Sequence, residues 1–242
     1  MDGFLLAIQF LTRIPVKKNI KFTRKNLKNA VYFFPFTALI IAVIVTIPFV
    51  LIPITEFRVS SALAISIYCL ITGSLHLDGL SDTVDGFWGG KDKEDIIKIM
   101  KDSRIGAFGV IALILIILTK FAIYTSIANQ PHLIIIAIVN SRFSAVHLLN
   151  NFKTPNYGGF ADSFSKGRIG KGELILLLGY AITMAIYDYK YILSLVLTIL
   201  FTRIMGRKAV KKIGAVSGDI IGATVEISDI LSLITLWVIK WI

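Results

Sequence analysis

Three aspartates that follow an apolar stretch are spaced so that they could do chemistry together. Asp78, Asp82 and Asp85 stand at positions i, i+4 and i+7 of the run His76-Leu-Asp-Gly-Leu-Ser-Asp-Thr-Val-Asp-Gly86. On a helix, this spacing places all three carboxylates on one face. Three like charges so close repel each other unless a cation lies among them, and Mg²⁺ prefers carboxylate oxygens. The pattern predicts a Mg²⁺ site at these aspartates, with a solvated polar face beyond a helix end as the alternative.

A second polar group, Asp102, Ser103 and Arg104, precedes the next apolar stretch. Asp102 could add a carboxylate to the metal site, and Arg104 could hold a phosphate with two parallel hydrogen bonds. The alternative for Arg104 is a positively charged membrane anchor without a catalytic role. The apolar and basic alternation over residues 96–101 favours a helix that lies at the membrane interface.

Further charged residues lie within apolar stretches. Arg142, His147 and Arg203 are placed toward one end of two such stretches, and ionisable residues there usually face the protein interior or a wet cavity. We therefore take Arg142 and Arg203 as candidates for binding an anionic substrate. Lys120 and Lys240 lie nearer the other end, where we expect them only to extend their charge to the interface.

A late acidic segment begins at Ser217-Gly-Asp219 and reaches Glu226. Asp219 and Glu226 are seven residues apart and share one helical face, while the small residues between them allow a close approach of backbone or ligand. We expect this second acidic cluster to meet the first at one membrane face, together with several arginines. Such a balance of charges suits a metal and a phosphorylated substrate.

Lipid must be part of the solvent that surrounds these residues. The chain has 242 residues, of which 55% are hydrophobic, and its mean hydropathy is +0.77. The net charge of +11 does not indicate a nucleic-acid partner, because the basic residues cluster between the apolar stretches. The single cysteine, Cys69, excludes an intrachain disulfide.

The apolar stretches predict an all-α, polytopic membrane bundle of about seven helices in a single domain, residues 1–242. Each stretch can cross about 30 Å of hydrocarbon, and unpaired backbone groups are not tolerated there, so the spans should be helices. The fifth is short, and the seventh contains Glu226 and Asp229. The predicted spans are residues 30–52, 59–76, 107–128, 132–150, 172–187, 190–206 and 219–242.

Positive charge in the loops predicts the orientation of the bundle. Twenty Lys and Arg residues lie before the first span and in the loops 77–106, 151–171 and 207–218, against two, Arg58 and Lys190, in the other loops. This asymmetry places the N-terminus and the acid-rich loop in the cytoplasm of a multi-pass cell-membrane protein. The apolar run Phe4–Leu11 precedes its basic residues, so it predicts an amphipathic helix lying on the membrane rather than a signal peptide.

Four segments also resemble the motifs of a known family. Two are the run from His76 to Phe87 and the run Lys101-Asp-Ser-Arg-Ile-Gly-Ala-Phe-Gly109, and they are the more specific. The others are Phe10-Leu-Thr-Arg-Ile-Pro15 and Ser217-Gly-Asp-Ile-Ile-Gly-Ala223. The four segments resemble the cobalamin synthase, or adenosylcobinamide-GDP ribazoletransferase, family, and the resemblance spans nearly the whole chain. Ser217 stands where the family pattern has a threonine, which keeps the hydroxyl group.

This resemblance implies a Mg²⁺-dependent membrane transferase late in adenosylcobalamin synthesis. Such an enzyme joins adenosylcobinamide-GDP to α-ribazole or its 5′-phosphate and releases GMP. Under this hypothesis Asp78, Asp82 and Asp85 bind Mg²⁺ at the pyrophosphate, with Asp78 and Asp82 also catalytic. The general base stays open among His76, Asp102 and Asp219. The expected substrate-binding residues are Ser103, Arg104, Arg142, Arg203, Ser217 and Asp219.

Two other functions fit a polar seven-helix bundle. A secondary transporter is the main alternative, but its site would be expected near the membrane midplane, at broken helices related by a repeat. A non-catalytic membrane anchor would not need so many acids and arginines. Beside its substrates, the expected partners are the lipid bilayer and either a second copy or other cobalamin-assembly enzymes. The number of metals and the preferred lower-ligand base stay open.

Overall fold

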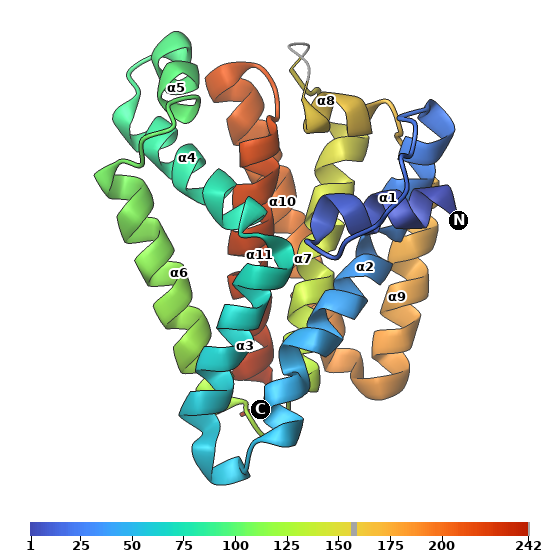
Figure 1. The fold of residues 1–242 in the computed structure, drawn as a ribbon, viewed down its shortest axis with the longest axis vertical. Coiled ribbons are helices and arrows are strands. Elements are labelled where there is room, and N and C mark those ends of the chain that lie inside the picture. The colour runs from blue at the N-terminus through green and yellow to red at the C-terminus, as the bar shows by residue number, and fades with distance from the viewer. Residues whose placement is uncertain (156–158, 242) are drawn as a thin grey trace.

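The computed structural model describes residues 1–155 and 159–241, and these residues form helices and loops without a β-strand (Figure 1). The predicted all-α membrane bundle is therefore confirmed. The helices are α1 (Asp2–Leu11), α2 (Arg24–Leu51), α3 (Phe57–Thr72), α4 (Leu75–Gly89), α5 (Lys93–Met100), α6 (Ala107–Ser126), α7 (His132–Asn151), α8 (Phe160–Ser165), α9 (Gly172–Asp188), α10 (Ile192–Ile213) and α11 (Gly218–Ile239). Short 3₁₀ turns, Ile54–Glu56 and Tyr189–Tyr191, precede α3 and α10.

Helices lie at each of the seven predicted spans. By length and hydropathy, five helical stretches of the described chain can cross a membrane, or six if the bent pair α3 and α4 is one span. One of these stretches, Gly172–Ile213, contains the turn at Tyr189–Tyr191, where the chain reverses so that α9 and α10 run in opposite directions (Figure 1). The number seven stays a prediction. Residues 156–158 of one predicted loop and residue 242 of the last predicted span lie outside the described residues.

The short helices gather at one end of the bundle. Helices α4, α5 and α8 lie toward the upper end in Figure 1, which also holds the loops 90–92, 101–106, 152–155, 166–171 and 214–217. Most of the loop Lys and Arg residues belong to this end, which we call the basic end. Helix α1 is a helix as predicted, but Leu6, Ala7 and Leu11 are buried in the protein rather than turned to lipid.

Helix α7 forms the centre of the bundle. Within its most apolar stretch, 83% of α7 is buried, whereas only 22% of the corresponding stretch of α6 is buried. Helix α7 is therefore surrounded by protein, while α6 faces outward. The amide Nδ2 of Asn140 on α7 donates hydrogen bonds to Ser194 Oγ (2.9 Å) and Ser232 Oγ (2.8 Å). These bonds satisfy a buried amide and hold α7 against α10 and α11.

The predicted span 59–76 ends earlier than expected, because the chain bends by 88° between α3 and α4. Gly73 and Ser74 both take left-handed backbone angles there, with φ of 60° and 56°. Glycine adopts this conformation without strain, whereas it is sterically strained for Ser74, so contacts of the surrounding structure must stabilise it there. After the bend, α4 carries Asp78, Asp82 and Asp85 on one continuous helix, which confirms the helical phase assumed for them.

The two ends of the bundle should lie on opposite sides of the membrane. In a Cys69→Ser background, we expect Glu94→Cys on α5 and Asn129→Cys, between α6 and α7, to react with a membrane-impermeant maleimide from opposite sides. Both positions are exposed, and the chain between them crosses from one end of the bundle to the other once, through α6. Labelling of both from the same side of sealed vesicles would contradict the arrangement.

Candidate active site

A cavity of about 310 Å³ opens at the basic end, between α1, α4, α7, α8 and α11. Its walls are mainly apolar and include Phe10, Phe34 and Phe164, while polar groups lie on α4 and at the start of α11. We call it the acidic cavity. Its polar and charged lining residues are His76, Asp78, Lys101, Asp162, Ser217 and Asp219.

The two acidic segments meet because α4 packs directly on the first turns of α11. A Cβ atom on Gly79 would lie 2.7 Å from the backbone oxygen of Asp219, and one on Gly222 would lie 3.1 Å from the Cα of His76. Neither position has room for a larger side chain without displacing backbone. The close approach predicted from the small residues of the late segment is therefore confirmed, and it places Asp78 beside Asp219.

The carboxylates at this crossing form no ion pair with another described residue, although Lys101 lines the same cavity. Asp82 lies within electrostatic range of Asp78 and Asp219. Within the described part of the chain, Asp82 accepts a side-chain hydrogen bond only from Ser81 Oγ (3.5 Å), and Asp219 accepts one only from Ser217 Oγ (3.4 Å). Among the described residues, none of the three forms an ion pair within 4 Å. Like charges collected without a counter-charge favour the binding of a cation.

The donor chemistry here fits Mg²⁺ in part. Carboxylate oxygens are hard ligands of the kind that Mg²⁺ prefers. Within the described part of the chain, however, no three His, Cys, Asp or Glu side chains are grouped tightly enough to hold a metal alone. Asp78, Asp82 and Asp219 would therefore supply part of the shell, with water and phosphate oxygens completing it, as is usual for Mg²⁺.

Asp85 lies on α4 but its carboxylate faces α6 instead of the cavity. Its Oδ2 accepts a hydrogen bond from the backbone N–H of Gly106 (2.7 Å), and its Oδ1 accepts one from the N–H of Gly109 (2.9 Å). The carboxylate thus caps the first turn of α6, where a negative charge is also favoured by the helix dipole. Its predicted metal role stays a prediction, and the geometry supplies a structural role in its place.

Asp85→Asn should lower the stability of the protein by about 1–3 kcal/mol. An asparagine side chain has one oxygen acceptor, so one of the two backbone N–H groups would lose its partner. Thermal unfolding in detergent measures the change, with the exposed Asp92→Asn elsewhere on the surface as a comparison for the charge. An unchanged melting temperature would contradict the capping role.

His76 is the buried polar group closest to the crossing. It is 5% exposed, lines the acidic cavity, and its Nδ1 has no hydrogen-bond partner among the described residues. A buried imidazole nitrogen without a partner is costly unless something else pairs with it. His76 thus borders the cavity, but its unpartnered Nδ1 is itself shielded from it.

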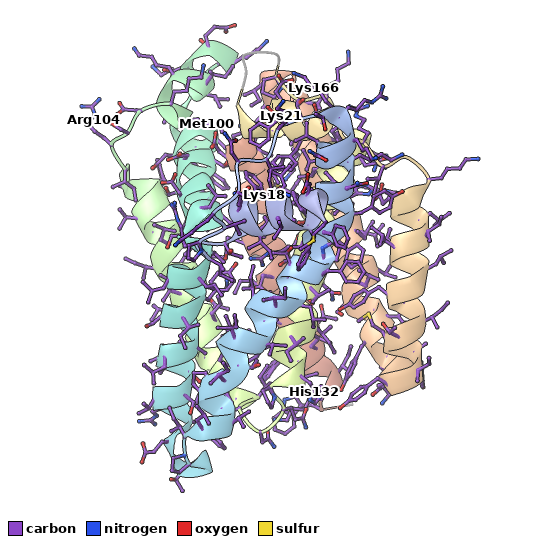
Figure 2. All side chains as sticks on the ribbon, turned by 45° about the vertical axis from the view of Figure 1, so that its right-hand side comes forward. Lys18, Lys21, Met100, Arg104, His132 and Lys166 are labelled. Atoms are coloured by element: carbon purple, nitrogen blue, oxygen red, sulfur yellow. The ribbon has the colours of Figure 1, made fainter. Side chains whose placement is uncertain are left out.

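The group Asp102, Ser103 and Arg104 does not line the acidic cavity. Arg104 instead binds its own neighbour: its Nη2 donates to Asp102 Oδ2 at 2.7 Å, and 87% of its side chain is exposed. Figure 2 shows Arg104 pointing away from the bundle. The hydrogen bonds from Arg104 lower the pKa of Asp102 to about 2. The predicted roles of these three residues stay predictions.

Arg142 belongs to a buried charge network below the cavity. Its Nη1 donates to Ser141 Oγ (2.9 Å) and its Nη2 to the hydroxyl of Tyr68 (3.3 Å), which in turn donates to Glu226 Oε1 (2.6 Å). Arg142 is fully buried and does not line the cavity. Glu226 likewise lies in this network, so the prediction that it joins Asp219 at the membrane face is wrong.

The prediction that Lys120 only reaches toward the interface is also wrong. Lys120 is 2% exposed, and its Nζ lies 2.7 Å from Glu226 Oε2 and 2.9 Å from Asp229 Oδ2. Two cations, Lys120 and Arg142, thus balance the two carboxylates in a lipid-embedded core. Such a balance removes the cost of isolated charges and joins α3, α6, α7 and α11.

Lys120→Met should destabilise the protein by about 3–5 kcal/mol, because it leaves two buried carboxylates with a single cation. Thermal unfolding in detergent is the measurement. Lys240→Met is a matched control, since Lys240 is partly exposed and bonds only the backbone oxygen of Ser126 among the described residues. Equal melting temperatures for the two variants would contradict the importance of the network.

Arg203 lies in a separate cluster. Its Nε donates weakly to His147 Nε2 (3.4 Å), and His147 Nδ1 pairs closely with Glu173. Glu173 also accepts from Asn150 (2.6 Å) and Asn151 (2.8 Å), so this cluster ties the outlying α9 to α7. Arg203 does not line the acidic cavity, and its predicted substrate role stays a prediction.

Several residues that line the acidic cavity are not predicted as site residues by the sequence. Phe164 and Phe10 form a ring pair with centroids 4.5 Å apart, and Asp162 lies beside them. Phe10 belongs to the Phe10–Pro15 motif, which was the only available signal for its place here. Phe164 and Asp162 had no such signal, because α8 is a short helix in a polar loop.

Comparisons with known proteins identify the family of the chain. The family model described as cobalamin-5-phosphate synthase matches residues 3–237. An adenosylcobinamide-GDP ribazoletransferase of Treponema denticola is 34% identical, covering 97% of each chain. One of Clostridium kluyveri is 36% identical over 99% of this chain and 97% of the relative, and one of Clostridium botulinum is 34% identical over 98% and 97%.

No solved structure matches the chain. The family model and the relatives nevertheless each cover almost the full sequence, including both acidic segments that meet in the cavity. The chain therefore belongs to the cobalamin-5-phosphate synthase family, a family of transferases in cobalamin biosynthesis.

Proposed function

We propose that this protein transfers the adenosylcobinamide phosphate group of adenosylcobinamide-GDP to α-ribazole or its 5′-phosphate, with release of GMP. The observation that carries the proposal is the pair of carboxylates, Asp78 and Asp219, that line the acidic cavity where α4 crosses α11, with Asp82 close to both but outside the cavity lining. The names of the relatives supply the donor and the acceptor group.

The transfer requires positioning and charge neutralisation more than covalent help from the protein. The acceptor hydroxyl forms a new bond to the cobinamide-linked phosphorus, the pyrophosphate P–O bond breaks, and GMP leaves with the electron pair. A Mg²⁺ ion held by Asp78, Asp82 and Asp219 would neutralise the negative charge of the pyrophosphate and the leaving phosphate. The apolar walls of the cavity exclude water, which strengthens these electrostatic interactions.

The hydroxyl proton needs an acceptor, and His76 and Asp219 are the two candidates, because both line the acidic cavity. The Nδ1 atom of His76 has no partner among the described residues, but it is shielded from the cavity, so this atom does not favour His76 over Asp219. The bonds between Asp102 and Arg104 on the outer surface weigh against Asp102 as the base.

The basic end supports a cytoplasmic placement of this cavity in the cell membrane. Helix ends rich in Lys and Arg usually remain in the cytoplasm, where nucleotide substrates are also found. Lys18, Lys21 and Lys166 belong to the loops of this half of the protein, whereas His132 is at the opposite end (Figure 2). The same lysines would attract anionic substrates and lipid headgroups.

Asp82→Asn should reduce Mg²⁺-dependent GMP release by about 100-fold or more, because it removes one carboxylate from the charge-neutralising group. The purified protein is incubated with adenosylcobinamide-GDP, α-ribazole phosphate and Mg²⁺, and mass spectrometry follows the cobalamin product and GMP. An unchanged melting temperature shows that the variant is folded.

Glu94→Gln is the matched control, since it removes one exposed carboxylate from the basic end outside the cavity. It should retain wild-type turnover. Normal turnover by Asp82→Asn would overturn the metal assignment. Absence of any product from the wild-type protein, together with uptake of a solute by proteoliposomes, would instead favour a transporter.

A further inference from the structure

A second cavity, of about 260 Å³, lies beside the acidic cavity between α1, the α3–α4 bend and α8. Phe10, Leu75 and Phe164 line both cavities and so form a shared wall. The second cavity differs in charge: Arg13 lines it, and no Asp or Glu is among its lining residues. We call it the Arg13 cavity.

The backbone of Arg13 is fixed at this place, while the residue is exposed. Its backbone N–H donates to the backbone oxygen of Ile71 (2.7 Å), so the residue is fixed to the end of α3. Its side chain lies directly over Gly73, where a Cβ atom would collide with Arg13 Nε. The left-handed glycine of the α3–α4 bend therefore provides the space that the Arg13 side chain occupies.

The loop that carries Arg13 is fixed by side chains of the same cavity. Gln9 Nε2 donates to the backbone oxygens of Lys18 (2.8 Å) and Val16 (3.2 Å), and Thr12 Oγ1 accepts from the N–H of Ile14 (3.1 Å). Thr72 Oγ1 donates to the backbone oxygen of Tyr68 (2.7 Å). These polar groups are thus used within the protein and serve to position the arginine.

The guanidinium group of Arg13 has neither an ion-pair nor a hydrogen-bond partner among the described residues. Across residues 1–155 and 159–241, it forms no ion pair within 4 Å, and no hydrogen bond of its side chain is found. A guanidinium presents a planar fork of N–H donors that matches the oxygens of a phosphate. A held arginine in a cavity free of carboxylates is therefore suited to an anion.

We propose that the Arg13 cavity binds the phosphate of the phosphorylated acceptor, and that Arg13 distinguishes this acceptor from its unphosphorylated form. This inference rests on the proposed function. A second anionic substrate would be repelled by the carboxylates of the acidic cavity, whereas Arg13 attracts its phosphate. Because the two cavities share a wall, an acceptor anchored at Arg13 can direct its other end toward Asp78 and Asp219.

The names found for the family bear on the same distinction. The family model is described as cobalamin-5-phosphate synthase, a name that refers to a phosphorylated product. The relatives are instead named for the transfer to ribazole. A phosphate-binding residue at the acceptor site determines which of the two acceptors is preferred. The shared chemistry, a phosphate oxygen, could also come from an anionic lipid headgroup, so the experiment must separate these sources.

Arg13→Gln is the test variant, because glutamine keeps a polar chain over Gly73 while removing the charge and the donor fork. We expect kcat/KM for α-ribazole 5′-phosphate to fall roughly 10- to 100-fold, with little change for α-ribazole. Arg13→Lys, which keeps a point charge without the fork, should lie between. Arg24→Gln, an exposed arginine outside both cavities, should behave as wild type toward both acceptors.

Three results would overturn the proposal. An equal loss with both acceptors would make Arg13 a structural clamp on the α3–α4 bend. A rise in KM for adenosylcobinamide-GDP alone would assign the cavity to the donor. The third result comes from measuring turnover both in phospholipid-free detergent and in micelles that contain phosphatidylglycerol. If Arg13→Gln lowers turnover only when the lipid is present, and equally for both acceptors, the Arg13 cavity binds a lipid headgroup.

A failure of the proposed function gives a different result. In that case the wild-type protein forms no product with either acceptor. Calorimetric titration of wild type and Arg13→Gln with α-ribazole 5′-phosphate still tests the inference directly. Tighter binding by the wild type supports the Arg13 cavity, and equal binding or no binding overturns it.

Discussion

The contact on which the site depends is the crossing of α4 over the first turns of α11. Gly79 and Gly222 lie so close to backbone of the other helix that a side chain at either place would push the helices apart. Only this separation brings Asp78 and Asp82 of one helix near Asp219 of the other. The repulsion among these carboxylates opposes the crossing, so packing elsewhere in the bundle must hold the two helices together.

The buried charge network provides part of that packing. Lys120 and Arg142 neutralise Glu226 and Asp229 within the spans and connect α6 and α7 to α11. A neutral cluster can remain in a lipid environment, whereas any one of its charges alone would be costly. The protein thus keeps its balanced charges inside the bundle and leaves its unbalanced carboxylates at the cavity, where a cation or substrate can reach them.

Local patterns in the sequence predicted the helices and the acidic face of α4, because helical periodicity and hydropathy act over a few turns. They could not separate Asp85 from Asp82, which share one face of α4 but meet different neighbours: two N–H groups of α6 for Asp85, and the start of α11 for Asp82. They also misplaced Lys120 and Glu226, since a charged residue in a span gives no signal of its partner on another helix. Arg104 shows a different limit: the sequence places Asp102 two residues away but does not say that the two side chains pair with each other.

Two neighbouring cavities of opposite charge are a physical solution to joining two anionic molecules. If both phosphates entered one acidic cavity, each would add repulsion, and a single cation would have to neutralise them together. With Arg13 on one side of the Phe10, Leu75 and Phe164 wall and a cation held by the carboxylates on the other, each anion would have its own counter-charge. The reacting ends then need to approach only where the two cavities adjoin. The α3–α4 bend serves both sides, because Gly73 seats Arg13 and the helix that follows presents Asp78.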